Sequence, residues 1–250
     1  MRFVLSNWKM HTTVDQAVGL ARAIEEGLRD RAEGGQALAT AIICPPAVSL
    51  APVRSVVRGE LLRLGAQTCH WEREGPYTGE ISPTMLHGLV DYVMVGHSER
   101  RAAGETDDEV ARKVRAVADA GLVPILFVGE QEHGDDAARQ WEHQLRRGLS
   151  LVDPTTTEVL VVYEPAWAVG AEEAADVDHV GAQVTRLKDR LAQSGVREPH
   201  VIYGGTVSED NLDRFAGLPV LDGVGATRAG LDPATFLRMV DTVAVEAPGP

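Results

Sequence analysis

The sequence predicts a single closed (β/α)8 barrel of the α/β class over residues 1–250. Short apolar, β-rich runs alternate with longer segments of helical periodicity, and this alternation repeats eight times. Eight β/α pairs is the number that closes a parallel barrel. The runs at 125–128 and 159–162 are apolar throughout, as parallel strands buried on both faces are. No linker or low-complexity tract indicates a second domain.

The elements follow in order along the chain. The expected strands are 2–6, 39–44, 60–65, 91–95, 122–128, 158–163, 199–203 and 220–225. The expected helices lie near 13–31, 47–57, 83–89, 106–120, 134–151, 174–194, 208–216 and 233–245. Pro124 falls near the start of its strand, where a missing amide donor is tolerated.

Capping signals support two of the helix starts. Thr106 and Glu109 form the pattern of a capping box, and Ser82–Pro83 places an N-cap before a proline at the first helical position. Apolar residues then recur at helical spacing at Val110, Val114 and Val117. The solvent-facing side is expected to hold Arg112, Lys113, Arg115 and Asp119.

Composition limits the classes of function. Apolar residues make up 44% of the chain and aromatic residues only 5%, so the core must consist mainly of aliphatic side chains. A net charge of −13 argues against nucleic acid, whose backbone requires a basic surface. Small anionic substrates remain compatible, because local lysines and arginines can override the global field.

The chain carries the features expected of a cytoplasmic protein. Cys44 and Cys69 form no disulfide framework and are expected to be inert thiols in a reducing compartment. No apolar run approaches the ~20 residues of a membrane span. Because the amino-terminal residues enter a strand pattern at once, we expect no signal peptide.

Three chemically useful side chains follow three of the expected strands. Asn7–Trp8–Lys9 ends the first run, His97 follows the fourth, and Glu164 follows the sixth, ahead of the stiffening Pro165. The carboxyl ends of barrel strands meet in one pocket. A carboxylate base and a hydrogen-bond donor for an oxygen are what proton transfer beside a carbonyl requires. No residues show metal-ligand spacing, and no nucleotide-binding glycine loop follows a strand, so no cofactor is expected.

Motifs distributed over nearly the whole chain resemble those of the triosephosphate isomerase family. They are Asn7 to Met10, Gly65–Ala66–Gln67, Tyr77 to Glu80, Gly96 to Arg101, Val128–Gly129–Glu130, Tyr163 to Gly170 and Tyr203–Gly204–Gly205. Their number and order make the resemblance specific, and it implies a TIM barrel without metal or organic cofactor.

The resemblance also implies residue roles. Glu164 is the base, His97 polarises the carbonyl, and Lys9 stabilises the enediolate and the substrate phosphate, while Asn7 orients Lys9 and binds substrate. This division of roles is the family's own and is carried over by resemblance. Taken without it, Lys9 is a solvated lysine or the ion-pair partner of Glu99. The resemblance implies that Glu99 is buried, where it could tune Lys9 or shuttle protons; it is expected to be structural as readily as catalytic.

The phosphate end departs from the family pattern. The resemblance implies backbone amides from Gly170, from Gly205–Thr206 and from a glycine pair after the eighth strand. Thr206 replaces the usual serine and keeps a hydroxyl, but an ungapped alignment places Thr227–Arg228 at the glycine pair. The Arg228 guanidinium either enters the barrel mouth and replaces the lost amide contacts, which we favour, or points to solvent and pairs with a carboxylate such as Asp232.

The loop after Glu164, which reaches Gly170, is expected to close over the substrate as a lid. Further departures from the family pattern lie at this lid and around the base. Ala171–Glu172–Glu173 makes the lid hinge acidic, although Gly170 can still offer its amide to phosphate if only the outer hinge has changed. Thr68 stands where asparagine is usual, and Phe127 replaces a small cysteine. Arg100 and Arg101 are expected to brace loops. Retained chemistry with an altered phosphate end is typical of a paralogue with a changed substrate.

These observations predict an isomerase of a small phosphorylated ketose, acting through an enediolate on dihydroxyacetone phosphate and glyceraldehyde 3-phosphate in glycolysis. One alternative is a paralogue acting on a four-carbon sugar phosphate such as erythrulose phosphate. Another is a non-catalytic barrel used for binding, which the retained Lys9, His97 and Glu164 oppose. The resemblance further implies a homodimer built around the loop at residues 68–80, whose tip packs near the neighbour's Lys9.

Overall fold

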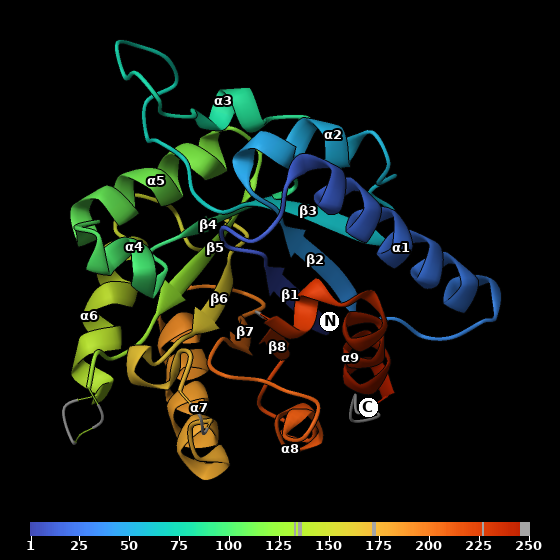
Figure 1. The fold of residues 1–250 in the computed structure, drawn as a ribbon. Coiled ribbons are helices and arrows are strands. Elements are labelled where there is room, and N and C mark those ends of the chain that lie inside the picture. Colours follow the sequence, from blue (N-terminus) through green and yellow to red (C-terminus); the bar gives the residue numbers. More distant parts are fainter. Residues whose placement is uncertain (133, 135–136, 172–173, 227, 246–250) are drawn as a thin grey trace.

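Eight parallel strands close into a barrel in sequence order (Figure 1). The computed structural model describes residues 1–132, 134, 137–171, 174–226 and 228–245. The strands are β1 (Phe3–Asn7), β2 (Thr40–Cys44), β3 (Leu62–Ala66), β4 (Tyr92–Val95), β5 (Val123–Val128), β6 (Leu160–Tyr163), β7 (His200–Tyr203) and β8 (Gly223–Ala226). The barrel closes where β1 pairs in parallel with β8, so the predicted (β/α)8 fold is confirmed.

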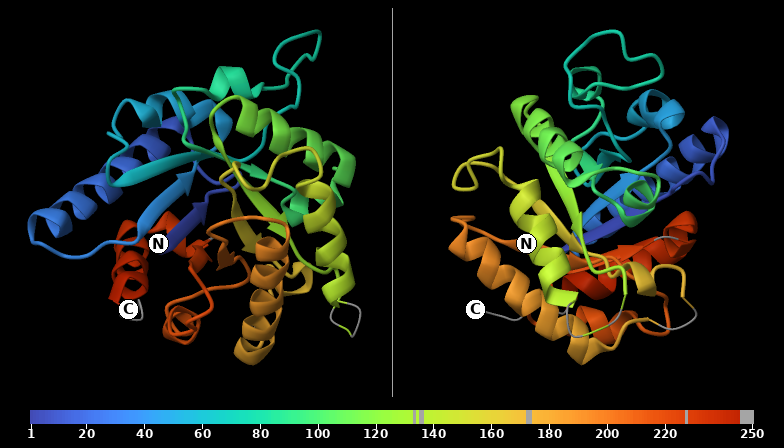
Figure 2. Two further views of the ribbon diagram at one scale, coloured as in Figure 1. Left: turned by 180° about the vertical axis from the view of Figure 1, so that it is seen from behind. Right: turned by 90° about the vertical axis from the view of Figure 1, so that its left-hand side faces the viewer.

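Helices surround the barrel on all sides, as the views in Figure 2 show. They are α1 (Val14–Glu33), α2 (Leu50–Arg54), α3 (Pro83–Leu86), α4 (Ser98–Ala102), α5 (Asp107–Asp119), α6 (Ala137–Gly148), α7 (Val177–Gln193), α8 (Leu212–Ala216) and α9 (Pro233–Val245), with the 3-10 turns η1 (Ala47–Ser49), η2 (Ala166–Ala168) and η3 (Arg228–Leu231). The expected elements are present with shifted ends. The sequence reasoning missed α4, η2 and η3, because a single turn is too short to show a period.

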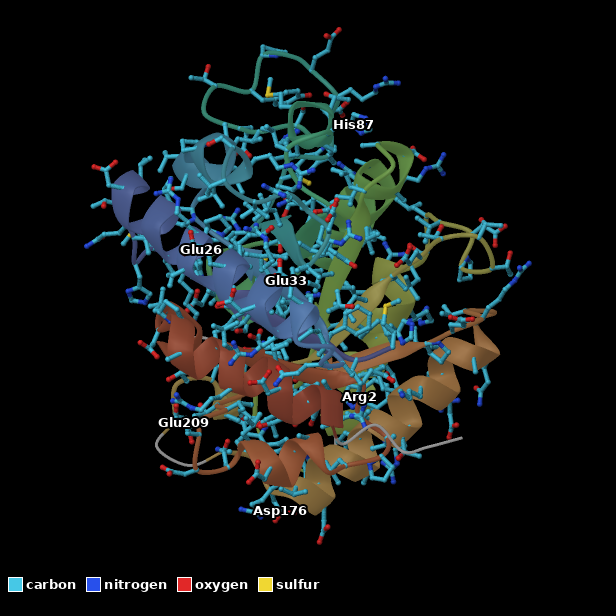
Figure 3. The ribbon with its side chains drawn as sticks, turned by 90° about the vertical axis from the view of Figure 1, so that its right-hand side faces the viewer. Arg2, Glu26, Glu33, His87, Asp176 and Glu209 are labelled. Carbon is cyan, nitrogen blue, oxygen red and sulfur yellow. The ribbon has the colours of Figure 1, made fainter. Side chains whose placement is uncertain are left out.

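The core has two layers, one inside the barrel and one between the barrel and its helices. Strand β5 shows the alternation that separates them: Ile125 and Phe127 point into the barrel, whereas Leu126 and Val128 face the helices. Burying one such aliphatic or aromatic side chain contributes roughly 1.5–3 kcal/mol. Charged side chains lie outside, including Glu26 and Glu33 on α1 (Figure 3).

The capping signals are confirmed. Thr106 and Glu109 exchange hydrogen bonds as a capping box, and the Ser82 hydroxyl accepts from the Met85 amide. The expectation that Lys113 faces solvent was wrong. Its side chain is only 7% exposed, and Nζ lies 2.5 Å from Glu105 Oε1. The buried carboxylate of Glu105 requires a cation, and Lys113 on α5 supplies it through its long side chain.

Both cysteines are buried free thiols. Burial raises the pKa of the Cys69 thiol to about 12, which is consistent with an inert side chain. Among the described residues, no helix has the length and apolar character needed to cross a membrane.

Candidate active site

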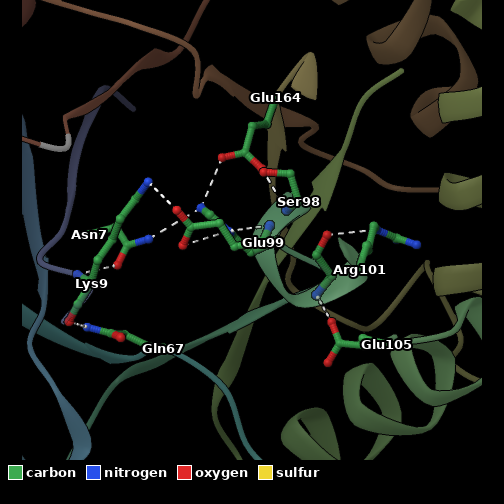
Figure 4. Close-up of polar contacts among 10 residues, drawn as sticks. Asn7, Lys9, Gln67, Ser98, Glu99, Arg101, Glu105 and Glu164 are labelled. Carbon is green, nitrogen blue, oxygen red and sulfur yellow. Dashed lines mark hydrogen bonds and ion pairs between the residues drawn. The ribbon is translucent and has the colours of Figure 1, made fainter. Parts of the chain in front are cut away.

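The carboxyl ends of three strands bring the predicted side chains into one cluster (Figure 4). Asn7 ends β1, with Lys9 two residues beyond it, His97 lies between β4 and α4, and Glu164 directly follows β6. His97 and Glu164 are 4% exposed, although nothing in the local sequence requires burial of either group. Barrel closure brings His97 and Glu164 together although they are 67 positions apart.

Glu164 and His97 are in direct contact. His97 Nε2 lies 3.0 Å from Glu164 Oε1, and the Ser98 amide donates to Glu164 Oε2 over 2.9 Å. Both carboxylate oxygens therefore face hydrogen-bond donors, which satisfies a buried anion. Ser98 was not predicted to take part in the site. It contributes its backbone amide, which every residue except proline has, so its residue type could not indicate this role.

The backbone selects the tautomer of His97. The Glu99 amide donates to His97 Nδ1 over 3.1 Å, since His97 occupies the N-cap position of α4. A backbone N–H is always a donor, so Nδ1 is the acceptor and the ring proton lies on Nε2. That N–H points to Glu164 Oε1. Asn7 Nδ2 also lies 3.3 Å from Nε2, but in this tautomer both nitrogens are donors, so they make no hydrogen bond to each other.

Lys9 is held in an unusual backbone conformation. Its φ is 48°, the single positive value among the described non-glycine residues. The Lys9 amide donates to Asn7 Oδ1 over 3.0 Å, and the Gln67 side chain donates to the Lys9 carbonyl over 2.8 Å. Backbone strain of this kind costs on the order of 1–3 kcal/mol and persists where neighbours enforce it. Gln67 belongs to a recognised motif, but its bracing contact was not predicted.

The ammonium group of Lys9 pairs with Glu99. Nζ lies 2.7 Å from Glu99 Oε1 at the barrel mouth. Within a single chain the predicted burial of Glu99 is wrong, because the side chain is 56% exposed. Its place in the single-turn helix α4 directs the carboxylate outward. Partial burial opposes ionisation, but the hydrogen bond and charge of Lys9 outweigh it, so the pKa of Glu99 lies below its usual value.

Arg101 braces the loop that carries His97, as expected. Its Nε donates to the Gly96 carbonyl over 2.7 Å, and Nη1 lies 2.5 Å from Asp107 Oδ1. The Gly96 amide donates to the buried Glu105 over 3.0 Å. Gly96 itself has a φ of 76°, which glycine adopts at little cost. Arg100 lies on the exposed side of α4.

Glu130 anchors the start of the loop that is expected to act as a lid, and it was given no role by the sequence analysis. It is fully buried, accepts from the Tyr163 hydroxyl over 2.9 Å and accepts from the Trp167 indole over 3.0 Å. Burial and the neighbouring Glu130 charge raise the pKa of Tyr163, which keeps its proton for this hydrogen bond. The sequence feature that could have indicated a role for Glu130 is its position just beyond an apolar strand, which it shares with Glu164.

The far end of the lid is tied to the loop after β7. The Thr206 hydroxyl donates to the Ala168 carbonyl over 2.8 Å, and the Ala175 amide donates to the Tyr203 hydroxyl over 3.2 Å. Gly205 is buried, and a Cβ there would lie 2.1 Å from the Tyr203 hydroxyl. Gly170 is exposed with a φ of 71°.

The largest departures at the phosphate end lie outside the described part of the molecule. These are Glu172, Glu173, Thr227 and the side chain of Arg228, so the two expected orientations of that guanidinium stay open. The carboxylate of Asp232, the alternative partner, accepts from the Thr235 amide over 2.8 Å at the start of α9.

A closed parallel barrel with a carboxylate, an imidazole and an ammonium group at its strand ends defines a (β/α)8-barrel enzyme of the acid–base class. The sequence model of the triosephosphate isomerase family matches residues 2–243. The chain belongs to this family.

Curated relatives agree with that assignment. The chain is 36% identical over 244 residues to "Triosephosphate isomerase" of Dehalococcoides mccartyi, with 94% of each chain covered. It is 35% identical over 243 residues to the Synechocystis protein of the same name, covering 95% of this chain and 97% of that one. It is 36% identical over 250 residues to the one from Roseiflexus, covering 96% of both.

Proposed function

We propose that this chain interconverts dihydroxyacetone phosphate and glyceraldehyde 3-phosphate. The observation that supports this most directly is the buried pair of Glu164 and His97, with a carboxylate oxygen 3.0 Å from Nε2. A base and a hydrogen-bond donor thus meet at one buried position. The reaction needs both, because a carbon proton must leave while the neighbouring carbonyl oxygen gains negative charge.

The proposed steps move one proton between adjacent carbons. Glu164 removes a proton from C1 of the ketose, the C1–H electron pair forms the enediolate double bond, and the carbonyl π pair moves to O2. The Nε2–H of His97 donates a hydrogen bond to the developing oxyanion, and the Lys9 ammonium adds a fixed positive charge. The O1 proton passes to O2, relayed by His97 Nε2, and the O1 electron pair forms the C1 carbonyl while the enediolate double-bond pair takes the proton that Glu164 returns to C2. The product is the aldose, with no net loss of atoms or electrons.

The described arrangement is a resting one. Both oxygens of Glu164 are occupied, by His97 Nε2–H and by the Ser98 amide. Each oxygen therefore has one donor contact that lowers its basicity toward a substrate carbon. We infer that substrate binding takes over the Nε2–H contact and that Glu164 rotates away from Ser98 before it acts as a base.

Substrate phosphate is proposed to bind at the amides of Gly170, Gly205 and Thr206, with Arg228 beside them. In support, Gly170 is exposed in a conformation that turns its backbone, and Thr206 hydrogen-bonds to the lid that carries Gly170. Closure of that lid would exclude water and protect the enediolate. Asn7 is proposed to contact substrate from the opposite side, through the amide that now approaches His97.

Turnover with a panel of three- to five-carbon ketose phosphates tests the proposal. We expect kcat/KM for glyceraldehyde 3-phosphate to reach about 10⁷ M⁻¹s⁻¹ or above, within roughly one to two orders of magnitude of the diffusional ceiling. Preference for a tetrulose phosphate over the triose phosphates would overturn the substrate and establish the four-carbon alternative, which the comparisons do not favour. If the chain turned over none of these ketose phosphates, the result would support the alternative of a non-catalytic barrel used for binding.

We also propose a homodimer built around the loop at residues 68–80. This loop projects from the barrel beside α3 (Figure 1). It is internally stiffened, since His70 stacks on Trp71 at 4.1 Å and packs against Tyr77 at 4.3 Å. Large apolar side chains are exposed on this loop, on α3, on η1 and just after β1: Tyr77, Met85, Val48 and Met10. A second copy would bury them and, by packing its loop near Lys9, would also cover Glu99.

Light scattering at micromolar concentration checks the assembly. We expect about twice the chain mass of 26.9 kDa for the unaltered protein. Tyr77→Arg should give monomers with reduced activity, because it places a charge in the interface core. Ala192→Arg, on the exposed side of α7, is the matched control and should stay dimeric. A fully active monomer of the unaltered chain would refute the proposal.

We place the protein in the cytoplasm and in carbohydrate metabolism. Its two buried free thiols suit a reducing compartment.

A further inference from the structure

Phe127 lies directly beneath the proposed active site. It is the last side chain of β5 that points into the barrel, and it is level with Val162 of β6 in the strand register. It is 3% exposed. Its ring therefore belongs to the interior layer on which the strand-end side chains rest, and the acid–base scheme above gives it no role.

The ring of Phe127 contacts the imidazole of His97. The two centroids are 5.0 Å apart and the planes meet at 62°, an edge-to-face arrangement that aromatic rings favour. Phenyl rings carry no hydrogen-bond donor or acceptor. Both nitrogens of His97 are thus left to their polar partners, the Glu99 amide at Nδ1 and Glu164 at Nε2.

These contacts restrain the imidazole in different directions. The two hydrogen bonds act along the ring plane and fix which way each nitrogen points. Small changes in the side-chain torsions of His97 tilt the ring plane and disturb these bonds less than a turn within the plane does, so a packing contact is needed to hold the tilt. Phe127 supplies one, because a rigid ring in a close-packed core blocks that tilting.

We propose that Phe127 is a positioning residue that sets the tilt of His97, and thereby aims the Nε2–H at the substrate oxygen. This inference rests on the proposed function, because it assigns His97 the donor role. Displacement of a catalytic group by about 1 Å can cost on the order of a hundredfold in rate. A smaller side chain at position 127 should therefore lower kcat more than it changes KM, which depends mainly on phosphate binding.

The barrel provides a matched control. Phe3 is also 3% exposed and contacts His200 edge to face, at 5.2 Å and 62°, at the amino-terminal end of the barrel. Phe127→Leu and Phe3→Leu thus remove the same ring from equivalent contacts. If Phe127→Leu does not accumulate as folded protein, Phe127→Met, which keeps more of the volume, replaces it.

Steady-state kinetics and nitrogen-15 NMR of the histidine rings test the proposal. We expect the variant at position 127 to lose about ten- to hundredfold in kcat with KM within about twofold, and the His97 ring signals to shift or broaden. Phe3→Leu should leave kcat and those signals unchanged. Unchanged kcat and His97 signals in the folded variant, or an equal loss in Phe3→Leu, would overturn it. If the unaltered protein isomerises no ketose phosphate, the proposed function fails, and the His97 signals alone decide whether Phe127 orients the ring.

Discussion

Glu164→Gln is expected to lower kcat by roughly two to four orders of magnitude, the range for loss of a positioned general base. An amide of the same shape cannot accept the carbon proton. In the resting structure the side chain also meets two donors, His97 Nε2–H and the Ser98 amide. The glutamine NH₂ must face one of them, so the free energy of unfolding should fall by about 1–3 kcal/mol without loss of the fold.

The control for this experiment is Glu25→Gln. Glu25 on α1 is as buried as Glu164, at 3% against 4%, but it lies outside the site. Its substitution should cost stability and leave kcat within about twofold. Kinetics on the best substrate of the panel, with circular dichroism to monitor folding, separates the two variants. Turnover near that of the unaltered protein in Glu164→Gln would disprove the assignment of the base.

Lys9→Met should reduce kcat/KM by about two to three orders of magnitude, as removal of a preorganised stabilising group does at other oxyanion sites. The methionine keeps the stem but removes the charge that the structure directs to the barrel mouth, 2.7 Å from Glu99. The loss should grow as ionic strength is lowered, because screening weakens the interaction that the unaltered enzyme uses.

Lys188→Met offers a closely matched comparison for the lysine variant. Lys188 Nζ lies 2.7 Å from Asp222 Oδ2, and the side chain is 23% exposed against 22% for Lys9. The Lys188→Met substitution therefore removes an equivalent ion pair, one that lies away from the carboxyl ends of the strands. We expect a stability change alone. If both lysine variants lower kcat/KM equally, the effect at Lys9 is structural, and its electrostatic role must be abandoned.

The order of elements and the location of the site were predictable from the sequence. Apolar runs and helical periods report burial through local spacing, and strand-end placement puts Lys9, His97 and Glu164 on one rim of any closed parallel barrel. Capping pairs such as Thr106 and Glu109 were equally readable, since their partners lie three residues apart.

Only the tertiary structure decided which groups are buried and paired. The helical pattern predicts a solvent-facing Lys113, but the structure buries it against Glu105. The family resemblance implies a buried Glu99, but α4 leaves its carboxylate exposed at the barrel mouth. The ring contact between Phe127 and His97 joins residues from adjacent strand ends that no local pattern links. Burial of a charge or a ring depends on partners distant in sequence, and barrel closure is what brings them within contact distance.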